Sequence, residues 1–487
     1  MSRKKRAEFS SRIGKRKAKL AKVRNRVLFS NLVNFVLPEG ALCLKGELHG
    51  NIKWLPEQLA AQALIWSWQD TKLVTDAFEK TLEICEQIGL KDIAMTYTAF
   101  MNAIGRYRAL LGDRLRLRQQ QLTMEIGGRY FRTNNWVLIA FDGSRSTAPR
   151  SAANEKAYCA PNYGHGKTSK YRKKKSKGLR RKRNKKHKNE PQEPQVWITM
   201  MWHMGLRLPW TWRLGPSNSS ERGHVQEMLE NEEFPTDTLF CGDAGFVGYR
   251  LWKAIIDAGG DFLVRVGANV KLLSEHVNFT KHSGGIVHCW PKDKQASGDP
   301  PLRLRLVQVL VGKIKMWMLS SVLDERHLSI KQIVDYYKMR WGIEVEFRGL
   351  KQTIDKHKLR CRNSDRLLAE LDWSLRGMAI AELLALQQQI PKEKRKSKYN
   401  PKDRSLANTL RVLRRCMRNP DRQVRDDEGI LSDLSKATVQ RYQNKTDKRA
   451  RYRHKNPDKK PLGDPEVRKP TADERKKIKE YTLNLAA

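Results

Sequence analysis

Apolar residues recur along the chain with two spacings, each typical of one kind of element. Between residues 55 and 125 they recur at helical intervals, as at Leu59, Ala63 and Trp66. From residue 135 onward, short apolar runs rich in β-branched residues indicate buried strands. We predict strands at residues 136–141, 196–203, 209–214, 239–241, 262–266, 285–290, 302–311 and 314–322, and helices at 219–230, 249–258 and 330–354.

The order of these elements predicts a mixed α/β sheet with crossover helices. A long strand-rich stretch, residues 270–320, interrupts the alternation before the last long helix. We therefore expect a basic arm, a helical N-terminal domain, an α/β core built from two segments, a β-rich insertion and a basic C-terminal region with flexible tails. Their predicted bounds are 1–30, 31–130, 131–266 with 318–390, 267–317 and 391–487.

The charge of the chain points to a class of partner. Lys and Arg number 96 against 52 acids, and the formal net charge is +44. A field of that sign attracts a polyanion, and the counterions released on binding supply free energy. The sequence has no apolar run of about 18 residues that could span a bilayer, and its basic N-terminus lacks the apolar core of a signal peptide. Nucleic acid is therefore favoured over a membrane surface.

Basic residues gather in several further stretches. Lys and Arg dominate residues 167–190, so we expect a disordered surface loop over 164–194. Residues 404–418 are predicted to form a basic helix. Arginines also decorate residues 106–118, where a DNA-binding domain and a helical core with a solvated basic face remain alternatives. Seven scattered Cys without a C-x-x-C pair indicate neither a zinc framework nor a disulfide scaffold.

Two acidic residues come directly after predicted strands. Asp142 follows the run at 136–141, and Asp243 follows Gly242 after the run at 239–241. Ionised carboxylates are costly to bury, and like charges on adjacent strand ends would be relieved by divalent cations. Two such ions about 3.5–4 Å apart can activate an attacking oxygen and stabilise a leaving one. The alternative is that each Asp only begins a turn, because Asp-Gly and Gly-Asp-Ala-Gly are good turn sequences.

A third acid lies on the last predicted helix. At about 100° per residue, four polar side chains fall within an arc of roughly 60° beside the apolar face: Tyr337, Arg340, Glu344 and Lys351. Glu344 is thereby aimed along the sheet edge, and Arg340 and Lys351 are placed for phosphate contacts. Glu346 points the other way and is predicted to face solvent. Ordinary surface pairing of Glu with Arg and Lys is the alternative for such a helix.

With these spacings, the chain resembles the DDE transposases of the insertion-sequence-four family. The segment YYKMRWGIEVEFRGLK carries that family's Y-x2-R-x3-E-x6-K signature. FDGSRS around Asp142 resembles the family's first-Asp region, and CGDAGFVGYRLWKAI, followed by FLVRV, resembles its second. The likeness covers roughly residues 130–375. The basic stretch at 167–190 and the tail beyond 391 depart from the family pattern.

The resemblance implies a ribonuclease H-like catalytic core that carries a β-rich insertion. It makes Asp142, Asp243 and Glu344 the catalytic residues and the ligands of Mg²⁺, for which Mn²⁺ can substitute. It also implies contacts to the DNA end near the cut from Tyr337, Arg340, Arg348 and Lys351. In some members an insertion-domain Trp stacks on a flipped base, and Trp317 stands at a suitable place. A Trp in a strand is more often a core residue, so both roles of Trp317 stay open.

The activity implied by the resemblance is metal-dependent strand cleavage and strand transfer at the ends of an insertion sequence. Hydrolysis frees a 3′-hydroxyl, which then attacks target DNA. The implied partners are double-stranded DNA, both transposon ends and target, and a second copy of the chain in a synaptic homodimer. We expect the protein in the bacterial cytoplasm, associated with the nucleoid. A metal-dependent DNA nuclease of the same fold and a catalytically inactive DNA-binding remnant are the alternatives.

Overall fold

The computed structural model describes residues 22–44, 46–159, 193–275, 284–312, 314–390, 400–425, 429–439 and 462–484. The predicted loop at 164–194 therefore lies almost wholly outside the described residues, as does most of the predicted arm at 1–30. Within the described part of the chain, no helix is both long enough and apolar enough to cross a membrane.

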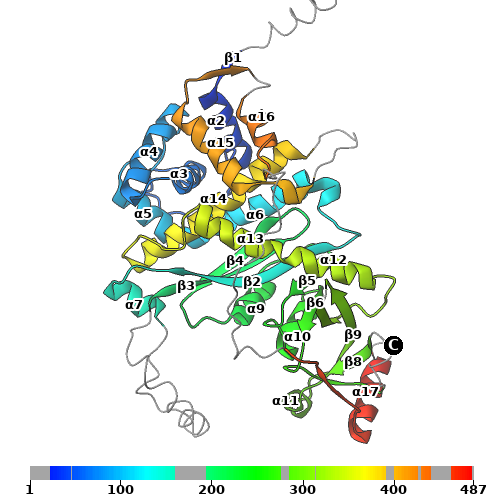
Figure 1. Ribbon diagram of the computed structural model, residues 1–487. Helices are drawn as coiled ribbons and strands as arrows, with labels where there is room; N and C mark the ends of the chain where they lie inside the picture. Colours follow the sequence, from blue (N-terminus) through cyan, green and yellow to red (C-terminus); the bar gives the residue numbers. More distant parts are fainter. Residues whose placement is uncertain are drawn as a thin grey trace, which may run out of the picture.

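A ten-stranded mixed sheet runs through the described part of the molecule (Figure 1). Its strands lie in the order β12-β7-β8-β9-β10-β6-β5-β2-β3-β4. The pairs β2–β5, β5–β6 and β7–β12 are parallel, and the other pairs are antiparallel. The bounds are β2 Val137–Thr147, β3 Gln195–His203, β4 Leu208–Gly215, β5 Thr238–Gly242, β6 Asp261–Val266, β7 Lys271–Leu273, β8 Gly284–Cys289, β9 Leu302–Val311, β10 Ile314–Ser320 and β12 Glu466–Arg468.

Helices cover both faces of this sheet. In Figure 1, α6, α12, α13 and α14 lie on one side of it, and α9 and α10 lie on the other. Strands β1 (Lys22–Arg24) and β11 (Gln423–Arg425) form a separate two-stranded sheet. The helix bounds are α2 Asn25–Val36, α3 Pro56–Trp68, α4 Val74–Gln87, α5 Tyr97–Arg106, α6 Arg108–Gly127, α7 Ala152–Tyr158, α9 Glu221–Asn231, α10 Tyr249–Asp257, α11 Lys292–Ala296, α12 Ile330–Arg340, α13 Gly342–Arg348, α14 Ser364–Gln389, α15 Leu406–Arg418, α16 Ile430–Ser435 and α17 Ala472–Asn484.

The central helix α14 joins the sheet layer to the helical layers. It is buried along nearly its whole length, on all sides, from Leu367 to Leu386. Such a helix needs partners for its polar residues, since an unpaired buried charge is costly. Trp68 of α3 donates its indole N–H to the Gly377 carbonyl at 2.8 Å, and Trp212 of β4 donates to Asp372 at 2.7 Å. α14 is thus tied to the N-terminal helices on one side and to the sheet on the other.

The strand β2 is longer than its apolar run predicts. The sequence places Asp142 at a strand end before a turn, but β2 continues to Thr147. It continues because its other edge stays paired with β3, where Asp142 lies opposite Met200 and Thr147 opposite Gln195. The turn interpretation of Asp142 is therefore wrong, and the residue sits within a strand.

The strand-rich stretch predicted as an insertion does not form a sheet of its own. Its strands extend the same sheet, because β10 pairs with β6, and β9 and β8 follow outward. β10 itself spans the boundary predicted between residues 317 and 318. These strands therefore lengthen the sheet on the side of β2 where β5 and β6 lie.

The long helix predicted over 330–354 is broken into three pieces. α12 ends at Arg340, α13 begins at Gly342, and a π-helical turn, η2, covers Gly349–Thr353. Gly342 permits a close approach at this break, because a Cβ there would collide with the ring of Trp202 on β3. The start of α13 therefore lies directly against the sheet, and this contact fixes the position of the Glu344 backbone.

The segment that follows η2 is held by one buried acid. Glu370 of α14 is fully buried and accepts from Lys356 Nζ at 2.8 Å and from the backbone N–H groups of Arg360 and Cys361 at 2.9 and 3.0 Å. Burial alone would raise the pKa of this carboxyl, but Lys356 and the two N–H donors hold it below its usual range. Glu370 thereby anchors the chain that follows α13 and η2.

The C-terminal region is ordered in places where composition predicts flexibility. β12 pairs with β7 at the sheet edge, and α17 packs beside it. Glu474 accepts from Arg468 and Gln295, and Tyr481 donates to the Gly298 carbonyl at 3.2 Å. Backbone pairing and ion pairs hold this polar segment in place. Its sequence has no apolar pattern from which the structure could be predicted. The expected basic helix near 404–418 is present as α15.

We predict that Glu370→Ala destabilises the fold by about 3–5 kcal/mol at neutral pH, because it leaves Lys356 buried without its partner. Since the pKa of Glu370 is depressed in the folded state, its contribution is present above the unfolded pKa and is lost as the pH falls through the folded value. Urea unfolding at pH 7 and at acidic pH measures both effects. Glu79→Ala, at an exposed position of α4, is the control. A destabilisation of the same size at both pH values would contradict the assignment.

Candidate active site

Asp142 and Asp243 lie at one level on neighbouring parallel strands. β2 and β5 pair in register up to Ala140 opposite Cys241. Asp142 lies two residues after Ala140, still within β2, and Asp243 lies two residues after Cys241, directly after the end of β5. The parallel pairing stops there, so the sheet opens between the two strands where the carboxylates project. This is the placement that the sequence predicts for the pair.

Local hydrogen bonds orient the two carboxylates. Asp142 Oδ1 accepts from the Gly143 N–H at 2.8 Å, and Asp243 Oδ1 accepts from the Gly245 N–H at 2.7 Å. The second contact makes a tight turn directly after β5, as Gly-Asp-Ala-Gly predicts. Phe141 and Phe246 pack beneath this edge with ring centroids 4.5 Å apart. The acids therefore stand on a rigid apolar base.

Arg340 links the third acid to the first. Its Nη1 lies 3.8 Å from Asp142 Oδ2, and its Nη2 lies 3.8 Å from Glu344 Oε1. Only 6% of the Arg340 side chain is exposed, and its Nε and Nη1 atoms have no hydrogen-bond partner among the described residues. Unpaired buried N–H groups are rare in proteins because each is costly. This guanidinium therefore has donors to spare for a further acceptor.

Burial is the main influence on the pKa of Asp142, and the neighbouring carboxylates add to it. Burial, together with the nearby Asp243 and Glu344 carboxylates, raises its pKa from 3.8 to about 6, against the lowering effects of the Gly143 N–H and of Arg340. A raised pKa of an acid in a cleft marks a functional candidate. Both other predicted acids, Asp243 and Glu344, lie near enough to Asp142 to contribute to this shift.

The three acids suit a divalent cation by chemistry. They offer only carboxylate oxygens, which hard ions such as Mg²⁺ prefer, and a cation would relieve the repulsion at Asp142. Among the described residues, however, no three His, Cys, Asp or Glu side chains are arranged to hold an ion jointly. Glu344 instead faces Arg340, and its side chain is 36% exposed, so it has room to turn. The oxygen donors thus suit such an ion by their chemistry, while Glu344 pairs with Arg340 in this structure.

Glu346 is not at the surface, contrary to prediction. It is 6% exposed and hydrogen-bonds with Glu382 of α14, and Arg404 lies 3.8 Å from Glu382. Burial and the neighbouring Glu382 raise the pKa of Glu346 well above its usual range. The helical count correctly directs Glu346 away from Glu344, but α14 and the Arg404 segment cover that face.

The predicted DNA contacts lie in different settings. Tyr337 is half-buried, with the Arg340 guanidinium 5.5 Å from its ring centre, and Arg348 is exposed. Lys351 has a lowered pKa because it is partly buried and lies near Arg145. Trp317 is 8% exposed and donates its indole N–H to Asp464 at 2.8 Å. In this arrangement the Trp317 ring is not open to a base, and the core role fits it.

Sequence reasoning missed a fourth acid. Glu221, the first residue of α9, has a raised pKa because it is buried and because Asp142 and Asp243 lie nearby. Its position after the capping Ser220 gives only the ordinary signal of an acid in a first helical turn. Arg145, which acts on both Glu221 and Lys351, was missed too. Only the folding of β2 against α9 brings these side chains to the site.

A groove of about 820 Å³ lies beside the Asp243 loop. Val247 and Gly248 of that loop form part of its wall, together with the basic residues Arg222, Lys271 and Lys292. Asn269 donates to the Ala244 carbonyl at 3.2 Å and so joins the loop to the segment before β7. The groove thus lies between the loop that follows Asp243 and the extended edge of the sheet, where Lys271 of β7 and Glu466 of β12 line it.

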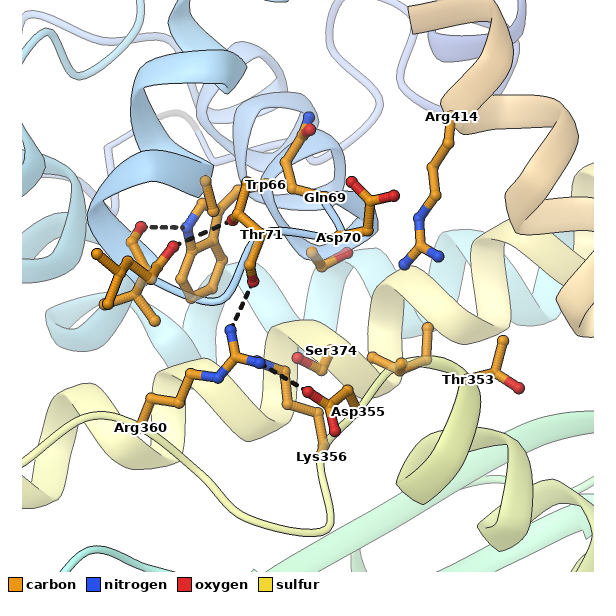
Figure 2. Close-up of a pocket in the computed structure, with 15 residues that line it drawn as sticks. Trp66, Gln69, Asp70, Thr71, Thr353, Asp355, Lys356, Arg360, Ser374 and Arg414 are labelled. Carbon is orange, nitrogen blue, oxygen red and sulfur yellow. Dashed lines mark hydrogen bonds and ion pairs between the residues drawn. The ribbon is translucent and has the colours of Figure 1, made fainter. Parts of the chain in front are cut away.

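A separate small pocket of about 100 Å³ lies between the end of α3 and the segment that follows η2 (Figure 2). Arg360 donates to the Thr71 carbonyl at 2.6 Å and to Asp355 at 2.7 Å, and Arg414 donates to the Trp68 carbonyl at 2.7 Å. Figure 2 shows these side chains converging from the segment after η2 and from α15 onto the end of α3. Their groups are engaged within the protein, so the pocket connects the catalytic segment to the N-terminal helices.

Comparison with known proteins supports one family. Residues 137–376 match a family model described as "Transposase DDE domain", a span that contains Asp142, Asp243 and Glu344. The match supports a DDE transposase. The chain also has a likeness to a piggyBac transposase solved by cryo-EM as a synaptic complex with hairpin DNA, at 12% identity over 87% of each chain and a TM-score of 0.37. A likeness at this TM-score does not establish a shared fold. A search of curated proteins gives no match.

We predict that Asp142→Asn stabilises the metal-free protein at neutral pH and has little effect near pH 4. The pKa of Asp142 is raised from 3.8 to about 6 in the folded protein. The contribution of protonated Asp142 to the free energy of unfolding is therefore fully present below the unfolded pKa and is lost as the pH rises through the folded pKa. The loss is on the order of 3 kcal/mol at pH 7 or above. Denaturant unfolding in chelator measures it, with Asp335→Asn, exposed on α12, as control. An equal effect at both pH values would refute the assignment.

Proposed function

We propose that this chain is a DNA transposase that catalyses metal-dependent strand cleavage and strand transfer at the ends of an insertion sequence. The observation that carries the proposal is the meeting of Asp142 and Asp243 at one sheet edge, with Glu344 sharing Arg340 with Asp142. The family match over the same span supports the same reaction class. The protein would act on nucleoid DNA in the bacterial cytoplasm.

A ribonuclease H-like catalytic core is part of the proposal. Support comes from the topology: β2, β3 and β4 form an antiparallel meander, α9 follows, and β5 and β6 then add in parallel on the other side of β2. This order places the first and second acids on adjacent strands, and α13 then brings the third acid against β2.

The chain's own residues divide the chemistry between them. Asp142, Asp243 and Glu344 would hold Mg²⁺, or Mn²⁺ in its place, which supplies Lewis-acid stabilisation of charge on the phosphodiester oxygens. Arg340 can donate its unpaired N–H groups to a phosphate oxygen. Lys351 and Arg145 add positive charge at the same edge. Phosphoryl transfer needs mainly positioning and charge neutralisation, which this set provides.

Double-stranded DNA is the proposed partner, as transposon end and as target. The net charge of +44 supplies general affinity. The groove beside the Asp243 loop, with Arg222, Lys271 and Lys292 along it, offers a path for a strand leaving the site. Arg348, exposed on α13, faces solvent near the acids and can contact the backbone. A homodimer in the synaptic complex is part of the proposal, by the family resemblance.

Strand joining separates the proposal from its two alternatives. Linear DNA ending in the inverted repeats that flank the coding sequence is incubated with the protein, a supercoiled plasmid and Mg²⁺. A transposase joins the 3′-hydroxyl ends to the plasmid. A nuclease of the same fold produces only nicks and free ends, and an inactive remnant produces a shifted DNA band without any cleavage.

We predict that Asp243→Asn abolishes cleavage and leaves DNA affinity within about twofold, because affinity comes from Lys and Arg contacts to phosphates. Losing several kcal/mol of transition-state stabilisation lowers the rate by at least about 100-fold. Cleavage of end-labelled DNA and a gel-shift titration measure the two quantities. Asp335→Asn should match the wild type in both. Cleavage by Asp243→Asn with undiminished metal dependence would show that the site is assigned wrongly.

A further inference from the structure

Glu221 enters the catalytic edge from the opposite face of the sheet. It is the first residue of α9, whose N-cap Ser220 accepts from the Gly223 N–H at 3.2 Å. His224, one turn later, contacts Thr199 of β3 at 2.9 Å. This contact holds the start of α9 against the strand that pairs with β2. Glu221 is thereby fixed beside Asp142 by its own helix.

Two further contacts fix the position of the Glu221 carboxylate. A Cβ added at Gly143 would collide with Glu221 Oε1, so the carboxylate lies against the residue that follows Asp142. Arg222 donates to the Val247 carbonyl at 2.8 Å, which ties the same end of α9 to the loop after Asp243. Glu221 therefore lies between the strand that bears one acid and the loop that bears the other.

The Glu221 carboxylate lacks the partners that a structural acid has. Within the described residues, no donor forms a hydrogen bond or a close ion pair with it, whereas Glu370 has three donors. Arg145 and Arg222 act on it only through longer-range attraction. The nearby acids disfavour the charged form of this half-buried carboxylate, and a divalent cation held by carboxylate oxygens would offset that repulsion.

A second, independent feature marks the same place as a ligand position. Arg340 is nine-tenths buried, and its Nε and Nη1 have no hydrogen-bond partner among the described residues. The guanidinium points at the edge that Asp142 and Glu344 share. A cation among the acids and an anionic oxygen on Arg340 would satisfy both sets of orphaned groups together, as a metal-bound phosphate ester does.

We infer that Glu221 is a fourth carboxylate that faces the divalent cation, together with Asp142 and Asp243. This inference rests on the proposed function and deepens it. Its consequence is that cation affinity depends on a residue of α9 that lies outside the three-acid signature. Glycine at 143 is then required because any side chain there would push the Glu221 carboxylate away from the edge.

The test measures Mn²⁺ binding to the full-length protein without DNA, by water-proton relaxation. Glu221→Gln should weaken Mn²⁺ affinity about 10–100-fold, the usual effect of losing a group that supports a metal site. Gly143→Ala should weaken it in the same direction, although it removes no carboxylate. Glu230→Gln makes the same charge change at an exposed position of α9 and should match the wild type. Asp142→Asn should lose binding.

A double substitution guards against a mere folding defect. In a Glu221→Ala background, Gly143→Ala should cause no further loss of Mn²⁺ affinity, because there is no longer a carboxylate to displace. Wild-type affinity in Glu221→Gln, with binding lost in Asp142→Asn, would overturn the inference and leave the proposed function standing. Wild-type affinity in Asp142→Asn would overturn the proposed site itself, and the inference with it.

Discussion

Repulsion between carboxylates at one edge of the sheet is the constraint on which the site depends. Asp142 cannot retreat from Asp243, because β2 stays paired with β3 as far as Thr147. Its side chain is only 20% exposed, so water screens the repulsion poorly. Positive charge must therefore stand beside the pair, and Arg340 is placed there by the end of α12. The same requirement makes the edge a natural position for a divalent cation and a phosphate.

Most elements of the core could be predicted from local sequence, for a physical reason. Buried strands are short apolar runs ended by turn residues, so β9 has the predicted bounds of Leu302–Val311 and β5 and β6 differ by a residue or so. α9 begins at Glu221, two residues after the predicted start, because Ser220 caps it. Local sequence could not predict which strands pair. β2 continues through polar residues because it stays paired with β3, and β12 joins the sheet because the edge of β7 is open to it.

The site was predictable as far as its residues lie on elements with a clear period. Asp142, Asp243 and Glu344 could be proposed because two apolar runs and one helix stripe select them, and the structure brings Asp142 and Asp243 to neighbouring strands. Glu221 was not found, since an acid in a first helical turn is usual and only tertiary packing brings it to Gly143. The surroundings of Trp317 were equally hidden from local sequence, because its hydrogen-bond partner Asp464 lies nearly 150 residues later in the chain.

The burial of Glu346 explains how Glu344 keeps its direction. The two acids lie two residues apart on α13, so they point to opposite sides of the helix. Because Glu346 is buried against Glu382 of α14, turning α13 would bring Glu344 into that buried space and move Glu346 out of it. Gly342, packed on Trp202, blocks sliding in the other direction. A costly buried acid on the far face thus fixes the orientation of the helix and keeps Glu344 on the side of Arg340.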